Sequence, residues 1–303
     1  MPLCALSRLT VLAAACLLVA AGQADPDAPV PRPGPAPLAD SARLRGTAGV
    51  AAIEGSSGGG IVPWATIAGY GSEDAVGGTA HVTVIRLSDF KLASAGANIG
   101  LFNRIEVSYA RQVLDTGRTG QGLGLGRGLT LRLDTVGLKV RVLGDVVYGP
   151  VLVPQIAVGV QFKQNARRSI VTALGARGAT GVDVYAAATK LLLNHSVLVN
   201  ATVRLTRANQ AGLLGFGGPE SNGYRPVFEA SIAWLPSRNL AIGAEVRTQP
   251  SMLHSTRSSP WVDAFIAWFP TKNVSATLAY LQFGTVGTRD HQSGVQISAQ
   301  MGF

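Results

Sequence analysis

The sequence has little of what disulfide-bonded, metal-binding or ordinary soluble proteins contain. Its two cysteines, Cys4 and Cys16, both lie near the start. If that segment is removed as a signal peptide, no thiol remains for disulfides, metal ligation or nucleophilic chemistry. Charged residues make up only 14% of the chain, whereas a soluble domain carries about a quarter. Beyond the first 24 residues, no apolar run approaches the roughly eighteen residues of a transmembrane helix.

The charge of the chain is positive, with a formal net value of +9. A positive charge of this size is typical of proteins that bind nucleic acid or anionic lipid. However, the Lys and Arg residues are scattered, and no basic cluster alternates with stacking aromatic residues. An exported chain also has little access to nucleic acid. We therefore expect no nucleic-acid partner.

The N-terminal segment predicts export. In residues 1–24, Arg8 precedes an apolar run over 9–21, and Gly22-Gln23-Ala24 supplies the small residues of a cleavage site. A lipoprotein signal at Cys16 is the alternative, which we disfavour because the apolar run continues past that residue. Residues 25–45 are rich in Pro and Ala without an apolar period, and they predict a disordered periplasmic lead. Residues 46–303 are then the folded domain.

The last ten residues, GVQISAQMGF, alternate between two faces. Val295, Ile297 and Phe303 fall on an apolar face, while Gln296 and Ser298 fall on the other. An apolar strand that runs to an aromatic end resembles the closing strand of bacterial outer-membrane β-barrels, which the insertion machinery reads. The resemblance implies that Phe303 is an insertion signal and that the barrel-assembly machinery is a partner.

The same alternation recurs in segments of about ten residues along the chain. In residues 197–206, for example, Val199 and Val203 oppose Asn200 and Arg204. One apolar and one polar face is the pattern of a strand between lipid and lumen. Short connections at 101–103, 144–149, 192–195, 236–239 and 270–273 alternate with longer ones at 115–133, 164–181, 207–224, 248–260 and 284–293. Trp234 and Trp268 begin two similar short turns, where an aromatic girdle would anchor a barrel at the membrane interface.

These patterns predict an all-β fold, a transmembrane antiparallel β-barrel of about 12–14 strands with short periplasmic turns and longer outer loops. About thirteen strands follow Trp64, and such barrels take an even number. Either Val50–Ile53 adds a strand and makes fourteen, which we favour, or the first segments fold inward and leave twelve. A soluble β-sandwich also alternates, but it explains neither the apolar C-terminal end nor the paired Trp turns. The expected location is the outer membrane of a Gram-negative bacterium, in contact with the lipid bilayer and lipopolysaccharide.

Four stretches, at residues 58–71, 105–117, 137–145 and 154–163, carry a family resemblance. They resemble a family of uncharacterised proteobacterial proteins that is described as a domain of unknown function and suspected of lying in the outer membrane. The resemblance implies an outer-membrane location. It supplies no activity and no functional residues.

Charged residues on the inward faces of the predicted strands are the candidate lumen lining. They are Lys139, Arg141, Lys163, Asp183, Arg204, Glu229, Glu245, Arg247 and Asp263. Inward charge is tolerable only beside water or a partner charge, so these groups either line a polar path or pair within a closed interior. We expect a passive pore for small polar solutes, without enzymatic activity or cofactor. A plugged, non-catalytic surface or assembly component is an alternative.

A second alternative is an outer-membrane lipid hydrolase. His291 and Ser293 lie two apart, so they share a face of the last predicted strand, where the histidine can act as base for the serine. The pair resembles the His-x-Ser of outer-membrane phospholipase and lipid A deacylase barrels, although Gly294 stands where those enzymes have Asn. No Cys or His spacing indicates a metal site, so we expect no metal.

Overall fold

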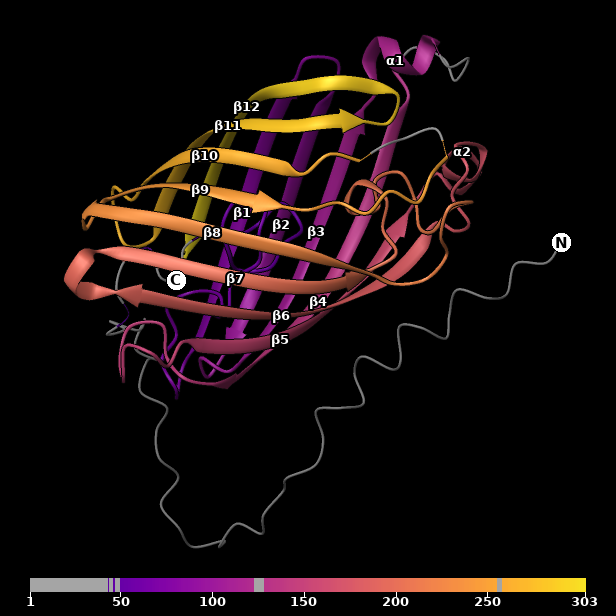
Figure 1. Ribbon diagram of the computed structural model, residues 1–303. Coiled ribbons are helices and arrows are strands. Elements are labelled where there is room, and N and C mark those ends of the chain that lie inside the picture. Colours follow the sequence, from indigo (N-terminus) through magenta and orange to yellow (C-terminus); the bar gives the residue numbers. More distant parts are fainter. Residues whose placement is uncertain (1–42, 44–45, 47–49, 123–127, 255–257) are drawn as a thin grey trace, which may run out of the picture. The chain divides into compact units, whose positions relative to one another are not determined.

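The computed structural model describes residues 43, 46, 50–122, 128–254 and 258–303. The predicted signal peptide and nearly all of the predicted periplasmic lead lie outside these residues. Twelve antiparallel strands form one closed barrel (Figure 1). The strands are β1 (Val76–Leu87), β2 (Lys91–Leu101), β3 (Ile105–Asp115), β4 (Thr130–Leu143), β5 (Gln155–Asn165), β6 (Thr180–Leu192), β7 (Val197–Thr206), β8 (Arg225–Ser237), β9 (Leu240–Arg247), β10 (Trp261–Trp268), β11 (Val274–Val286) and β12 (Arg289–Gly302).

Each strand pairs with its neighbour in the chain, and β1 closes the ring on β12. This last pairing runs from Thr79 opposite Gly302 to Leu87 opposite Gly294. A closed sheet leaves no edge strand, so every backbone group in lipid is bonded within the protein. The predicted transmembrane β-barrel is therefore confirmed. The count of fourteen strands is wrong, and the alternative of twelve strands with an inward-folded start holds.

The alternation of side chains decides which face each strand turns to lipid. In β7 every second residue is buried, and the residues between them, such as Val199, Val203 and Leu205, are exposed on the outside. This outward face is apolar because it meets hydrocarbon, while the polar partners face the interior. Trp234 and Trp268 lie near the ends of β8 and β10 and point outward, with 53% and 54% of their surface exposed.

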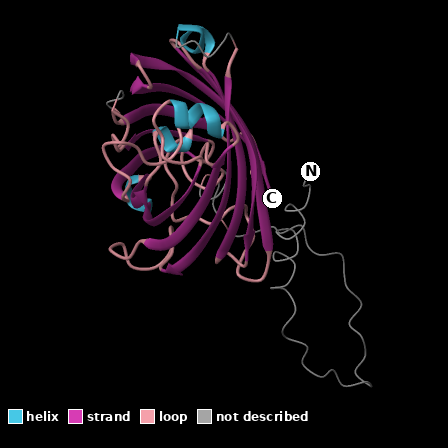
Figure 2. Cartoon of the chain, turned by 90° about the vertical axis from the view of Figure 1, so that its right-hand side faces the viewer, coloured by secondary structure: helices cyan, strands magenta, loops and turns pink. Residues whose placement is uncertain are grey.

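The connections differ at the two ends of the barrel. At one end the chain turns through the long segments 116–129, 166–179, 207–224 and 248–260. Helices α1 (Gly117–Gly122) and α2 (Arg168–Ala173), labelled in Figure 1, belong to the first two, and 3-10 helix η2 (Gln210–Gly212) belongs to the third. Figure 2 draws the helices in cyan among the loops. The other end has shorter turns, including η1 (Leu193–His195) and the two residues 238–239. None of the helices in the described part of the chain is long and apolar enough to cross a membrane.

Two predicted connections are wrong. Residues 284–293 do not form a long loop, because β11 and β12 stay paired as far as Val286 opposite Arg289. Gly287 adopts a φ of +60° in the resulting two-residue turn, a conformation that glycine accepts at low cost. Conversely, the short turn expected at 144–149 extends over 144–154.

Residues 50–71, which we call the plug, run inside the barrel instead of adding strands to it (Figure 1). Nearly all of them are buried, including Ile53, Trp64 and Tyr70. Within the described part of the chain, their β-pairing consists of isolated bridges, Ala51 with Ser57 and Gly58 with Pro63. Gly-rich and Pro-containing chain is a poor central strand, and it is buried on all sides here, so it shows no in–out alternation.

Candidate functional site

The barrel wall binds the backbone of the plug through polar side chains. Glu106 accepts hydrogen bonds from the amides of Ser57 (3.0 Å) and Ala68 (2.9 Å). Lys139 Nζ donates to the carbonyls of Ser57 (3.0 Å) and Trp64 (3.1 Å) and pairs with Glu106 at 3.1 Å. Other wall side chains bonded to plug backbone are Ser94, Asn98, Gln112, Gln155, Thr189, Thr202 and Gln300. A buried backbone without these partners would carry unsatisfied polar groups.

Glu54 of the plug is held by three basic side chains of the wall. Its carboxylate lies 2.5 Å from Lys163 Nζ, 2.9 Å from Arg247 Nη1 and 3.2 Å from Arg204 Nη2. All four groups are buried. Since a buried charge is tolerable only when it is paired, these contacts fix the plug at this point.

The plug also completes the charge balance of this part of the wall. Asp183 pairs with Lys163 at 2.7 Å, and Glu229 pairs with Arg204 at 2.6 Å. Arg247 is also 3.6 Å from Glu229. The wall thus supplies three cations and two anions to this cluster, and Glu54 supplies the third anion. Without Glu54 the cluster would carry one uncompensated positive charge.

All nine charged residues proposed for the lumen lie inside the barrel, none of them more than 7% exposed. Five of them form the cluster around Glu54, and Lys139 binds plug carbonyls. Arg141 reaches the short-turn end, where it pairs with Glu73 and Asp145. The two remaining acids, Glu245 and Asp263, form no ion pair with any described residue.

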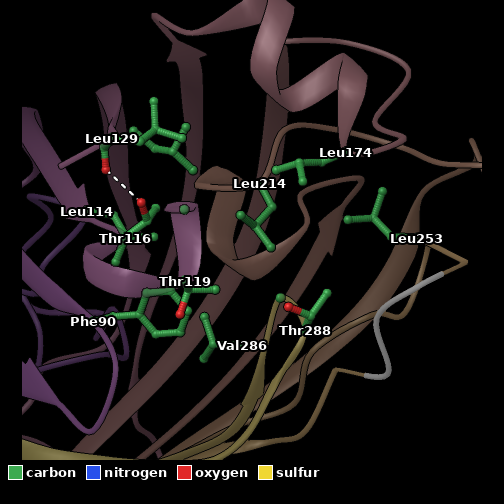
Figure 3. A pocket seen from close by; sticks show the side chains of 13 residues that line it. Phe90, Leu114, Thr116, Thr119, Leu129, Leu174, Leu214, Leu253, Val286 and Thr288 are labelled. Carbon is green, nitrogen blue, oxygen red and sulfur yellow. Dashed lines mark hydrogen bonds between the residues drawn. The ribbon is translucent and has the colours of Figure 1, made fainter. Parts of the chain in front are cut away.

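The long-loop end of the barrel is packed with apolar side chains. Figure 3 shows Phe90, Leu114, Leu174, Leu214 and Leu253 converging there from separate segments of the chain. The cavity they leave measures about 50 Å³. An apolar cavity of about 150 Å³ accepts benzene, so this one is too small for such a solute. The plug and this apolar packing together occupy much of the interior, and a recess of about 680 Å³ remains at the short-turn end beside Leu191, Leu235 and Lys272.

His291 and Ser293 do not form a nucleophile–base pair in this structure. Within the described residues, no hydrogen bond joins the two side chains and no carboxylate orients the histidine. His291 has a φ of +55° beside the irregular end of the β11–β12 pairing. A serine nucleophile needs its base within hydrogen-bond reach. Activity through this pair would require a rearrangement of this end of β12.

The C-terminal residue joins the last strand to the start of the barrel and to the plug. Phe303 turns its ring outward, with 60% of the residue exposed. Its carbonyl oxygen accepts hydrogen bonds from Tyr70 N (2.9 Å) and Gly78 N (3.0 Å). Tyr70 is near the end of the plug, so the chain terminus holds the plug to the seam between β1 and β12.

The sequence predicted an inward-folded start only as an alternative, and it did not single out Glu54. Two signals point to them. Gly58–Gly60 and Pro63 interrupt the apolar runs that predict strands. Glu54 stands between an apolar run and this glycine-rich stretch, and an acid in such a place needs a buried basic partner.

A model of the family described as "Protein of unknown function (DUF3034)" matches residues 47–300. No curated protein matches the chain. Among solved structures, the KdgM porin is similar at 10% identity, covering 74% of this chain and 99% of that one, with a TM-score of 0.48. An outer membrane channel from Pseudomonas putida F1 shows 12% identity, 80% and 97% coverage and a TM-score of 0.43. Outer membrane phospholipase A from Escherichia coli shows 9% identity, 78% and 94% coverage and a TM-score of 0.44.

Proposed function

We propose that this chain, which belongs to the DUF3034 family, is a channel for small polar solutes that its own plug holds closed. The barrel lies in the outer membrane of a Gram-negative bacterium, where a closed sheet with an apolar outer belt is the form that spans lipid. Lipopolysaccharide is the expected neighbour of its outer half. Phe303 at the end of β12 is the expected signal for the barrel-assembly machinery.

The observation that carries the proposal is the way in which the plug is held. It shares no ladder of strand pairing with the wall, and polar side chains of the wall bind its backbone. Such contacts can be exchanged for contacts with water when the segment leaves. The same wall side chains, including Lys139, Lys163 and Arg204, would then line a hydrated path. A barrel of about twelve strands is wide enough for such a path once the plug has left and the apolar side chains at the long-loop end have separated.

The test is solute uptake by proteoliposomes. Vesicles that contain a chain lacking residues 50–71 should swell rapidly in a solution of a small sugar. Vesicles that contain the intact chain should swell slowly. Glu73→Gln is the matched control, because it removes an acid that is exposed at the end of the barrel and not in the plug. Slow, heat-modifiable gel migration verifies that each variant is folded. A folded deletion variant as impermeable as the intact chain would overturn the proposal.

A further inference from the structure

Two buried carboxylates on neighbouring strands lack a basic partner among the described residues. Glu245 on β9 and Asp263 on β10 are directly opposite each other, face the interior, and are each 2% exposed. The other buried acids each form an ion pair with Lys or Arg; they are Glu54, Glu106, Asp183 and Glu229. No basic side chain of the described residues pairs with Glu245 or Asp263. Two adjacent buried anions are costly without a compensating charge.

Polar atoms around this pair are also short of hydrogen-bond partners. Asp263 Oδ1, Asp263 Oδ2 and Gln296 Oε1 are buried, and among the described residues only Glu245, on the neighbouring strand, comes within reach of the Asp263 carboxyl. Gln296 lies on β12 and is 2% exposed. Glu245, in contrast, accepts hydrogen bonds from the plug amide of Ile61 (2.8 Å) and from Ser231 Oγ (2.7 Å). The acceptor atoms that lack a full set of hydrogen bonds are therefore those of Asp263 and Gln296.

These side chains converge on the glycines of the plug. A Cβ placed on Gly60 would lie 3.5 Å from Glu245 Oε2, 3.6 Å from Asp263 Oδ2 and 3.0 Å from Gln296 Nε2. A Cβ on Gly59 would overlap the Glu245 carboxylate. Gly60 thus lets two carboxylate oxygens and the Gln296 amide, from three strands, approach one point.

A small cavity borders the same glycines. It measures about 30 Å³ and is lined in part by Gly59, Gly60 and Thr277. The rest of its lining is mostly apolar, including Leu198, Ala233 and Phe265, and none of the three side chains lines it. An apolar cavity stays dry, so this one is an empty space beside the glycines. Thr277 Oγ1 is buried and has no hydrogen-bond partner among the described residues.

We propose that Glu245, Asp263 and Gln296 bind a divalent cation of the Ca²⁺ type beside Gly60. Two carboxylates balance its charge, and the Gln296 amide, turned so that Oε1 faces them, adds a neutral oxygen. Hard cations prefer such ligands and complete their coordination with water. In the described part of the chain no three His, Cys, Asp or Glu residues gather to hold a metal. This site instead combines two acids with an amide.

The cation would connect the wall to the plug. Glu245 binds the Ile61 amide with the carboxylate that would also bind the metal. Occupancy would therefore hold Glu245 in the position that the plug requires. The binding site itself does not depend on whether the lumen opens, so it stands apart from the channel proposal.

Terbium luminescence on the full folded protein in detergent tests the site. Trp64 is close enough to sensitise the bound ion, since its Nε1 donates to Ser231 Oγ (2.9 Å) and Ser231 donates to Glu245. We expect Trp-sensitised Tb³⁺ emission that Ca²⁺ displaces. Asp263→Asn should weaken the affinity for both ions at least about 10-fold. The control Glu73→Gln removes an exposed acid outside the site, so it should leave both affinities unchanged.

A second variant and a second measurement complete the test. Gln296→Leu retains both carboxylates and removes only the amide, so it should fold and still lower the affinity for Ca²⁺. Calorimetry with Ca²⁺ alone should give one site per chain in the folded protein. Absence of Ca²⁺-displaceable emission would contradict the proposal and leave protons as the neutralising charge. Emission equal in the intact protein and in Asp263→Asn would assign the ion to surface acids and would likewise overturn the proposal.

Discussion

Replacing Glu54 with glutamine should release the plug. The substitution keeps the size of the side chain and removes the negative charge that faces Lys163, Arg204 and Arg247. Only Asp183 and Glu229 then remain to balance three buried cations. The wall keeps its own structure, so the loss falls on the contact between plug and wall.

The magnitude follows from the burial of the cluster. Removing one partner of a buried ion pair costs about 3–5 kcal/mol, because the opposite charge stays buried without compensation. Each 1.4 kcal/mol changes an equilibrium tenfold. The population of barrels with a released plug should therefore rise by about two to three and a half orders of magnitude. Glu73→Gln breaks an ion pair whose acid is 83% exposed. It should therefore change the free energy of plug release by less than about 1 kcal/mol.

A thiol placed in the plug reports its release. Ser56 is buried, and Ser56→Cys changes its size little. In a chain without the predicted signal peptide, this cysteine is the only thiol, because Cys4 and Cys16 precede it. A water-soluble thiol reagent should modify it slowly in the parent and faster with Glu54→Gln, by the factor given above. Equal, slow rates in both would show that the ion cluster does not hold the plug and would refute this role of Glu54.

Three further predictions concern other parts of the chain. Gly59→Ala should speed the same thiol reaction, because its Cβ meets the Glu245 carboxylate, whereas Gly223→Ala, which meets only a side chain 4.0 Å away, should not. Ser293→Ala should leave any phospholipid hydrolysis by the purified barrel unchanged, and a loss of activity would revive the hydrolase alternative. Deleting Phe303 should reduce the yield of heat-modifiable barrel in outer membranes, and an unchanged yield would remove its role as insertion signal.

The strands were predictable because the two faces of each strand have different surroundings. Along β7 or β10, lipid on one side and protein on the other impose a period of two on the sequence. The short turns with Trp234 and Trp268 added independent support. The end of the last hairpin was not predictable in this way, because the polar sequence GTRDHQSG is typical of a loop. In the structure most of it continues two paired strands beyond the apolar part.

The plug could not be recognised from alternation, because it contacts protein on every side. Ile61, Val62, Trp64 and Ala65 are all buried, and a short apolar run of this kind is equally typical of a strand. What distinguishes it is the long-range pairing of Glu54 with residues on β5, β7 and β9. Alternation placed those basic residues on the inward face, but no local pattern reveals which acid of a distant segment completes their charge.

The most direct test of the closed channel is single-channel conductance in planar bilayers, with the intact chain and Glu54→Gln compared under the same conditions. We expect long silence from the intact barrel and frequent discrete openings from the variant, both verified as folded. Silence from Glu54→Gln while its plug cysteine reacts rapidly would show that the plug leaves without opening a path. That result would contradict the proposed channel.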